Sequence, residues 1–357
     1  MTGDPAAAPA PLQREAIAAV DPAGMLDDVL DLPSHLRDAA WRVDSARLEP
    51  VPGCDALIVA GMGGSAIGGS LAQAVLGEAA VLPMASARGY ELPPWATERT
   101  MVLCASYSGH TEETLAVYEA AGVLGAPRIA ATTGGRLAEL ARAEGVPIVP
   151  LPGGFQPRAA VAYMTVVALE AAALAGVGPT VRCDLDVAGD HLSGLVTEWG
   201  PDGAEDGLAK SVARQLHGRV PVMAGAQLTA PVAYRWKCQL NENAKVPASA
   251  HELPELDHNE IVGWEGAAAL GPHAAVFLDD CDLHPRLRRR IELTRELVEP
   301  HAAATIVLEG RGESRLERLM SLVLLGDLVS VYLAVLQGID PTPADIIGRL
   351  KDALAAE

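Results

Sequence analysis

The sequence has little positive charge and very few lysines. Lys and Arg number 27 against 46 Asp and Glu, which gives a formal net charge of −19, and only four of these cations are lysines. A chain with this balance repels nucleic-acid phosphates and anionic lipid at long range. We therefore expect no nucleic-acid partner.

Cysteine is also scarce. The five cysteines lie far apart, and no two form a C-x-x-C pair. This pattern is typical of free thiols in a reducing compartment rather than of a disulfide framework. The first ten residues lack the basic start and apolar run of a signal peptide. We expect a cytoplasmic protein with a flexible tail over residues 1–15.

One apolar run, Met320 to Ile339, is long enough to span a bilayer. It contains Asp327 and Gln337, and a carboxylate near the bilayer centre costs about 3 kcal/mol. The run therefore predicts a buried core or interface helix, and we expect no membrane partner.

The rest of the chain is that of a globular protein with an α/β fold. Half of its 357 residues are hydrophobic, which is enough for a sizeable core and two domains. Short apolar runs alternate with helical patterns, which indicates parallel sheets flanked by helices on both faces. Strands are predicted at 55–60, 81–84, 101–105, 128–131, 147–151, 219–224, 274–278 and 305–308, and helices at 65–76, 112–123, 136–144, 159–176, 206–217 and 229–243. A turn-rich stretch at 178–189 predicts a linker between an N-terminal subdomain (16–180) and a C-terminal subdomain (190–357).

The loop after the first predicted strand is rich in glycine. Residues 61–65 read GMGGS, and a following helix would offer its positive end to an anion. A tight turn without a ligand is one alternative. A dinucleotide site is another, since Gly61, Gly63 and Ala66 fit G-x-G-x-x-A. The second strand, however, ends without a carboxylate for the ribose, and the first arginine is Arg88.

The loop after the third predicted strand carries a cluster of hydroxyl groups. Ser106, Ser108 and Thr111 precede a helix that begins near Glu112. One hydroxyl would suffice to cap that helix, so three of them favour a pocket for a phosphate monoester.

Further downstream, the sequence combines a carboxylate and a histidine. Glu242 lies at the end of an amphipathic helix, and His258 lies among acidic residues. Either residue could be structural, but together at a phosphate pocket they suit proton transfer near neutral pH. His251 and His258 do not have a recognised metal-ligand spacing, so we expect no metal and no other cofactor.

Taken in order, GMGGSAIGG, SYSGHTEETL, PRAAVAYM, NENAK and ELDHNEIVGW resemble the bifunctional phosphoglucose/phosphomannose isomerases of the sugar isomerase (SIS) superfamily. The resemblance runs from about residue 32 to the C-terminus. It implies two SIS-type doubly wound subdomains, a homodimer, and metal-independent interconversion of glucose 6-phosphate or mannose 6-phosphate with fructose 6-phosphate through a cis-enediolate.

The resemblance also implies residue roles. Glu242 would move the proton between C1 and C2, Arg158 would stabilise the intermediate, and His258, from the neighbouring subunit, would open the ring with help from Lys351. Thr342 is assigned to the rotation that admits both C2 epimers. The sugar phosphate would be bound by Gly63, Gly64, Ser65, Ser106, Ser108 and Thr111.

Three features differ from the family pattern: His110, Ala162 and a longer segment between His258 and Lys351. They leave the preferred sugar open. Isomerisation of another phosphosugar and a non-catalytic sugar-phosphate sensor remain the alternatives at this stage.

Overall fold

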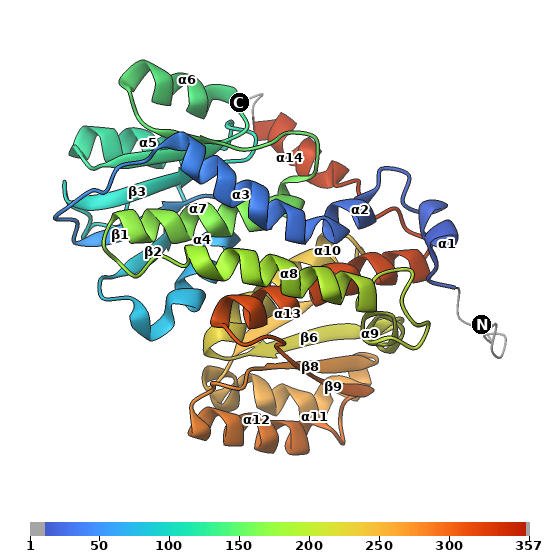
Figure 1. Ribbon diagram of the computed structural model, residues 1–357. Helices are drawn as coiled ribbons and strands as arrows, with labels where there is room; N and C mark the ends of the chain where they lie inside the picture. The colour runs from blue at the N-terminus through green and yellow to red at the C-terminus, as the bar shows by residue number, and fades with distance from the viewer. Residues whose placement is uncertain (1–10, 355–357) are drawn as a thin grey trace.

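The computed structural model describes residues 11–354 and contains two parallel sheets with helices on both faces of each (Figure 1). The first sheet has the strand order β2-β1-β3-β4-β5, and the second has the order β7-β6-β8-β9. The strands of the first sheet are β1 (Ala56–Ala60), β2 (Met84–Ala87), β3 (Thr100–Ala105), β4 (Arg128–Thr132) and β5 (Ile148–Pro150). Those of the second are β6 (Val220–Gly225), β7 (Ser249–Glu252), β8 (His273–Asp279) and β9 (Ala304–Glu309). The predicted α/β class with parallel sheets is confirmed.

The helices divide between the two halves of the chain. The first half contains α1 (Arg14–Ala18), α2 (Met25–Leu30), α3 (Leu32–Ala46), α4 (Gly64–Leu76), α5 (Glu112–Leu124), α6 (Gly135–Glu144) and α7 (Val161–Leu174). The second half contains α8 (Arg182–Trp199), α9 (Leu208–Leu216), α10 (Ala230–Glu242), α11 (Glu260–Leu270), α12 (Pro285–Val298), α13 (Arg315–Leu336) and α14 (Asp345–Leu354).

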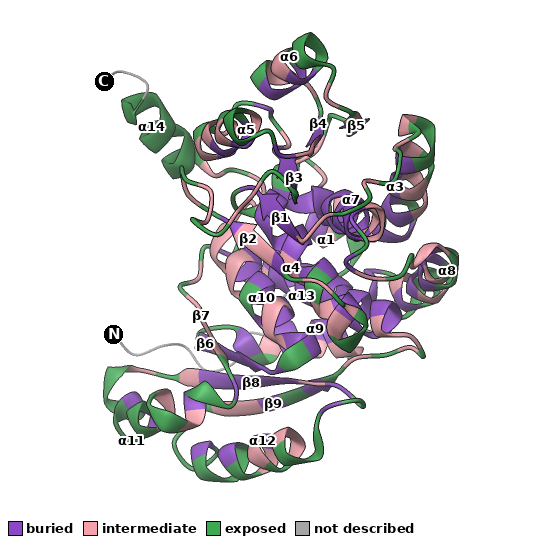
Figure 2. Cartoon of the chain, turned by 90° about the vertical axis from the view of Figure 1, so that its left-hand side faces the viewer, coloured by how far each residue is buried: buried purple, intermediate pink, exposed green. Residues whose placement is uncertain are grey.

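Helices from both halves of the chain fill the space between the two sheets, as Figure 2 shows, and we call them the shared helix layer. Successive side chains of β1 alternate between the two faces of its sheet: Leu57 and Val59 pack on this shared layer, whereas Ile58 and Ala60 face α5 and α6. The second sheet likewise faces α10 and α13 on one side and α11 and α12 on the other. The main hydrophobic core therefore contains residues from both halves of the chain.

The helix α13 occupies the centre of this layer. All residues from Leu316 to Val335 are buried. Its start is fixed by a capping box, because the Ser314 hydroxyl accepts from the Glu317 N–H (3.2 Å) and the Glu317 carboxylate accepts from the Ser314 N–H (2.8 Å). Pro157–Leu174 and Arg315–Leu336 are long and apolar enough to cross a bilayer, yet the most apolar 18-residue segment of each is 83% and 94% buried inside the protein. The prediction of a buried core helix is confirmed.

Three sequence-based boundaries need correction. The second strand is at Met84–Ala87 and not at 81–84, because Val81 is exposed and Pro83 has no N–H for a strand ladder. The predicted linker largely belongs to α8, which packs on α3 and α13. Residues 1–10 of the predicted tail lie outside the described residues, but Leu12 is fully buried and α1 begins at Arg14. The division into subdomains 16–180 and 190–357 stays a prediction.

Small residues bring α4 close to its neighbours. A Cβ on Gly68 would lie 2.5 Å from the backbone of Met164 in α7, and one on Gly69 would lie 2.8 Å from Val59 in β1. These contacts leave no space for a methyl group. They fix the start of α4, and with it the glycine loop, relative to α7.

We expect Gly68→Ala to lower the free energy of unfolding by about 1–3 kcal/mol, because the added methyl group must displace backbone. Gly194→Ala is the matched control, since Gly194 lies in α8 and a Cβ there would meet nothing within 4 Å. That change should raise stability by about 0.5–1 kcal/mol through helix propensity. Urea unfolding of both variants measures the difference, and equal effects would contradict the close-packing argument.

Candidate functional site

The glycine loop lies between β1 and α4 and approaches the chain itself closely. Gly63 has φ +52°, which favours glycine. A Cβ on Gly64 would lie 2.8 Å from the Pro157 carbonyl oxygen, and one on Gly61 would lie 2.8 Å from that of Ala105. The loop therefore needs glycine to fit beside the segment that carries Arg158, as well as to leave backbone N–H groups open.

The three hydroxyl groups after β3 lie in one loop, and a hydrogen bond connects that loop to Ser65. The Ser106 and Thr111 hydroxyls are 2.8 Å apart, and the Ser65 hydroxyl accepts from the Tyr107 N–H at 3.3 Å. The Ser108 hydroxyl accepts from the His110 N–H at 3.2 Å. None of them caps α5 through its side chain. Hydroxyl groups that are not used as caps, at the start of a 13-residue helix, suit an anion.

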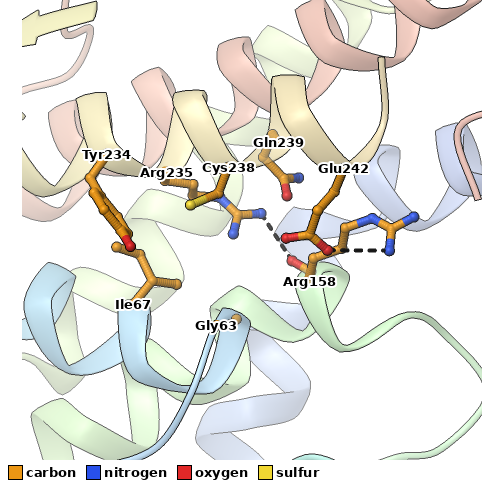
Figure 3. Close-up of a pocket in the computed structure, with 9 residues that line it drawn as sticks. Gly63, Ile67, Arg158, Tyr234, Arg235, Cys238, Gln239 and Glu242 are labelled. Carbon is orange, nitrogen blue, oxygen red and sulfur yellow. Dashed lines mark hydrogen bonds and ion pairs between the residues drawn. The ribbon is translucent and has the colours of Figure 1, made fainter. Parts of the chain in front are cut away.

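Glu242 and Arg158 face each other across a pocket (Figure 3). Glu242 is the last residue of α10, and Arg158 lies in the short helix Pro157–Ala160 before α7. The carboxylate Oε2 is 3.6 Å from the guanidinium Nη1, and the two side chains are 31% and 4% exposed. The partly exposed Glu242 carboxylate thus lies beside the buried positive charge of Arg158.

Several acceptors hold the Arg158 guanidinium in place. Its Nε donates to the Asn243 Oδ1 at 2.6 Å, and its Nη2 donates to the carbonyl oxygens of Pro341 (2.9 Å) and Thr342 (2.7 Å). Burial lowers the pKa of Arg158, and the charge of Glu242 opposes that shift. The guanidinium is thereby oriented by α10 and by the segment that follows α13.

A buried ion pair holds the backbone of Arg158 in place. Arg235 donates from Nε and Nη2 to the two carboxylate oxygens of Asp327 at 3.0 and 2.5 Å. Its Nη2 also donates to the Arg158 carbonyl oxygen at 3.0 Å. The Asn243 amide donates to the Ser330 hydroxyl at 2.9 Å. Both supports reach Arg158 from α13.

Sequence reasoning missed most of the pocket lining. The pocket has about 290 Å³ of open space. Besides Gly63, Gly64, Arg158 and Glu242, it is lined by Ile67, Tyr234, Arg235, Cys238 and Gln239. Four of these five lie on α10 at a spacing that puts them on the face of Glu242, so helical periodicity counted back from Glu242 could have found them. Burial raises the pKa of the Cys238 thiol.

Within one chain, His258 lies away from Glu242. Because β7 is parallel to β6, the intervening α10 runs back across the sheet and ends at the edge where strands begin. His258 follows β7 at the opposite edge, where it is exposed. The 13 residues of α10 span about 20 Å. The structure therefore does not bring these two residues together in one chain.

Lys351 is also outside the pocket lining. It lies on α14, which has no buried residue and stands apart from the main layers in Figure 2. The lysine beside Glu242 is Lys245, whose amine donates to the carbonyl oxygens of Glu242 and, at 3.2 Å, of Pro341. Burial and the charge of Arg158 lower the pKa of Lys245. The Thr342 hydroxyl is buried and has no hydrogen-bond partner in the structure.

Residues 11–354 contain no group of three or more His, Cys, Asp and Glu side chains that could hold a metal ion. The expectation that the protein works without a metal stays a prediction. The roles predicted for His258, Lys351 and the phosphate-binding hydroxyls likewise stay predictions.

Comparisons with known proteins point to one family. Residues 205–354 match the family described as bacterial phospho-glucose isomerase C-terminal SIS domain. The chain is 39% identical over 304 residues to a bifunctional phosphoglucose/phosphomannose isomerase of Caldicellulosiruptor bescii, covering 84% of this chain and 90% of that protein. It is 36% identical over 315 residues to one of Aquifex aeolicus, covering 88% and 94%.

A solved structure shows the same fold. The crystal structure of a glucose-6-phosphate isomerase like protein from Thermus thermophilus matches with a TM-score of 0.61 and 22% identity, covering 96% of this chain and 99% of that one. The predicted SIS-type fold is therefore confirmed.

The Arg235–Asp327 pair should be essential to the described site. We expect Asp327→Asn to lower the free energy of unfolding by about 3–5 kcal/mol, because it leaves a buried guanidinium without its counter-charge. The double variant Arg235→Met/Asp327→Leu should recover most of that loss, since it removes both charges. Chemical denaturation of the single and double variants measures the coupling, and additive losses would contradict it.

Proposed function

Because the chain belongs to the bifunctional phosphoglucose/phosphomannose isomerase family, we propose that it interconverts glucose 6-phosphate and mannose 6-phosphate with fructose 6-phosphate. The observation that carries this proposal is the Glu242–Arg158 pair in the pocket. An aldose–ketose isomerisation needs one base for a proton on adjacent carbons and one positive group for the charge that develops on the oxygens. The pair supplies both groups within 3.6 Å.

In the proposed mechanism, Glu242 takes the proton from C2 of the open-chain aldose and returns it to C1. The electrons pass through a cis-enediolate, whose oxygens lie toward the Arg158 guanidinium. A planar cation in a fixed orientation stabilises that charge without reorganising during the step. The same carboxylate serves both carbons because they are neighbours.

The phosphate is assigned to the hydroxyl cluster. Ser106, Ser108 and Thr111 offer O–H donors, and the starts of α4 and α5 add N–H groups and positive dipole ends. Support comes from the hydrogen bond between Ser65 and the Tyr107 N–H, which ties the two loops to each other. The bound sugar phosphate would then extend from this hydroxyl cluster, which holds its phosphate, to Glu242, which contacts C1 and C2.

We further propose a homodimer in which His258 of one subunit serves the pocket of the other. The support is topological: His258 and Glu242 lie at opposite edges of the second sheet in a single chain, and His258 is exposed. His258 can therefore act at this pocket only from a second copy of the chain. We assign Lys351, with His258, to ring opening, and we assign Thr342, whose carbonyl oxygen accepts from Arg158, to the rotation about C2–C3 that admits both C2 epimers.

The direct test incubates the purified protein with fructose 6-phosphate in excess EDTA and quantifies glucose 6-phosphate and mannose 6-phosphate with separate coupling enzymes. We expect both products. A single product would restrict the activity to one epimer. Tight binding without any product would favour a sugar-phosphate sensor and overturn the proposal.

Glu242→Gln should lower kcat by about 10²- to 10⁴-fold, because the amide cannot accept the carbon-bound proton. Binding of fructose 6-phosphate, followed by calorimetry, should persist. Glu119→Gln is the matched control, since Glu119 is exposed on α5. Normal turnover by Glu242→Gln would show that another residue is the base.

Mixed dimers test the shared site. Glu242→Gln and His258→Ala proteins should each be inactive alone. After reversible unfolding and refolding of an equal mixture, half of the dimers carry both variants, and each has one intact site. Activity should then rise to about one quarter of the wild-type value. No recovery, with mixed dimers confirmed by mass, would place both residues in the site of a single chain.

A further inference from the structure

Two positively charged side chains lie against one tyrosine at the pocket rim. The Arg88 guanidinium carbon is 5.3 Å from the centre of the Tyr234 ring, and the Lys237 Nζ is 4.8 Å from it. Tyr234 lines the pocket and is 41% exposed. In Figure 3 it lies at the opposite end of the pocket face of α10 from Glu242. We call Arg88, Tyr234 and Lys237 the cationic rim.

The elements of the fold bring these residues together. Arg88 follows directly after β2, at the edge of the first sheet where strands end and ligands of such sheets bind. Its Nη2 donates to the Ser70 hydroxyl of α4 at 2.8 Å, which orients the guanidinium. Lys237 lies one helical turn after Tyr234 on α10. The rim therefore contains residues from both halves of the chain.

The charges of the rim are not neutralised by the protein. Among the described residues, neither Arg88 nor Lys237 forms an ion pair with a carboxylate, whereas Arg235 in the adjoining pocket is neutralised by Asp327. Because the net charge of −19 repels a dianionic substrate from most of the surface, a local pair of free cations gives the field at the rim the opposite sign.

We propose that the cationic rim is a peripheral anion site that captures the phosphate dianion of an incoming sugar phosphate and directs it into the pocket. The inference rests on the proposed function for the identity of its ligand. Tyr234 and Glu242 are eight residues apart on α10, or about 12 Å, so the rim is separate from the atoms that exchange protons. It acts on association and not on the chemical step.

The test compares Arg88→Gln/Lys237→Gln with wild type at several salt concentrations. We expect kcat/KM at low ionic strength to fall about tenfold, kcat to stay within about twofold, and the difference to shrink at about 1 M salt, where charges are screened within a few ångströms. Arg47→Asn/Arg286→Gln is the control, because it changes the net charge equally at exposed positions outside the rim, and Asn tolerates the positive φ of residue 47. This control should retain the wild-type values.

Two results would overturn the proposal that the cationic rim is an anion site. One is an unchanged salt dependence of kcat/KM in the rim variant, and the other is an equal change in the control. If the wild type has no turnover at all, the proposed function fails, and equilibrium dialysis with inorganic phosphate tests the rim separately. The rim variant should then bind phosphate about tenfold more weakly than wild type and control. Equal binding by all three proteins would reject the site whatever the activity.

Discussion

The fixed position of the Arg158 guanidinium is the constraint on which the rest of the site depends. Its acceptors come from the end of α10 and from the segment after α13, while its own carbonyl oxygen is held by Arg235. A buried guanidinium is expensive unless its donors are satisfied. The two halves of the chain must therefore be packed together before the pocket exists.

The shared helix layer meets that requirement. Residues of both sheets belong to one hydrophobic core, and α13 lies buried along nearly its whole length in the middle of it. The Arg235–Asp327 pair lies inside this apolar layer, where the two charges contact each other and Arg235 also donates to the Arg158 carbonyl oxygen. Removal of either charge would leave the other buried and unpaired in a low-dielectric interior, which destabilises the folded protein. The packing of the buried helices therefore determines the geometry of the site.

Positive side chains gather at the pocket of an otherwise acidic protein. Most surface charge is negative, but Arg158, Arg235, Arg88 and Lys237 gather along one side of α10 and its neighbours. Only Asp327 and Glu242 lie among them as carboxylate partners. A dianionic sugar phosphate thus meets a cluster of positive side chains at the pocket. Hydroxyl groups near the helix starts then offer donors without adding further charge.

The sequence by itself determined the alternating α/β architecture, a buried helix in the apolar run at 320–339 and the motif loops, because periodicity and glycine-rich turns are local properties. It also supplied Glu242 and Arg158 through the family resemblance, 84 positions apart in the chain. It missed Asn243, Arg235 and Gln239, whose roles follow from packing between α10, α13 and the start of α7. Only the tertiary structure decided that Lys351 lies outside the pocket lining, and that His258 is at the far edge of its own sheet from Glu242. These are distances between segments remote in sequence, and no local pattern encodes them.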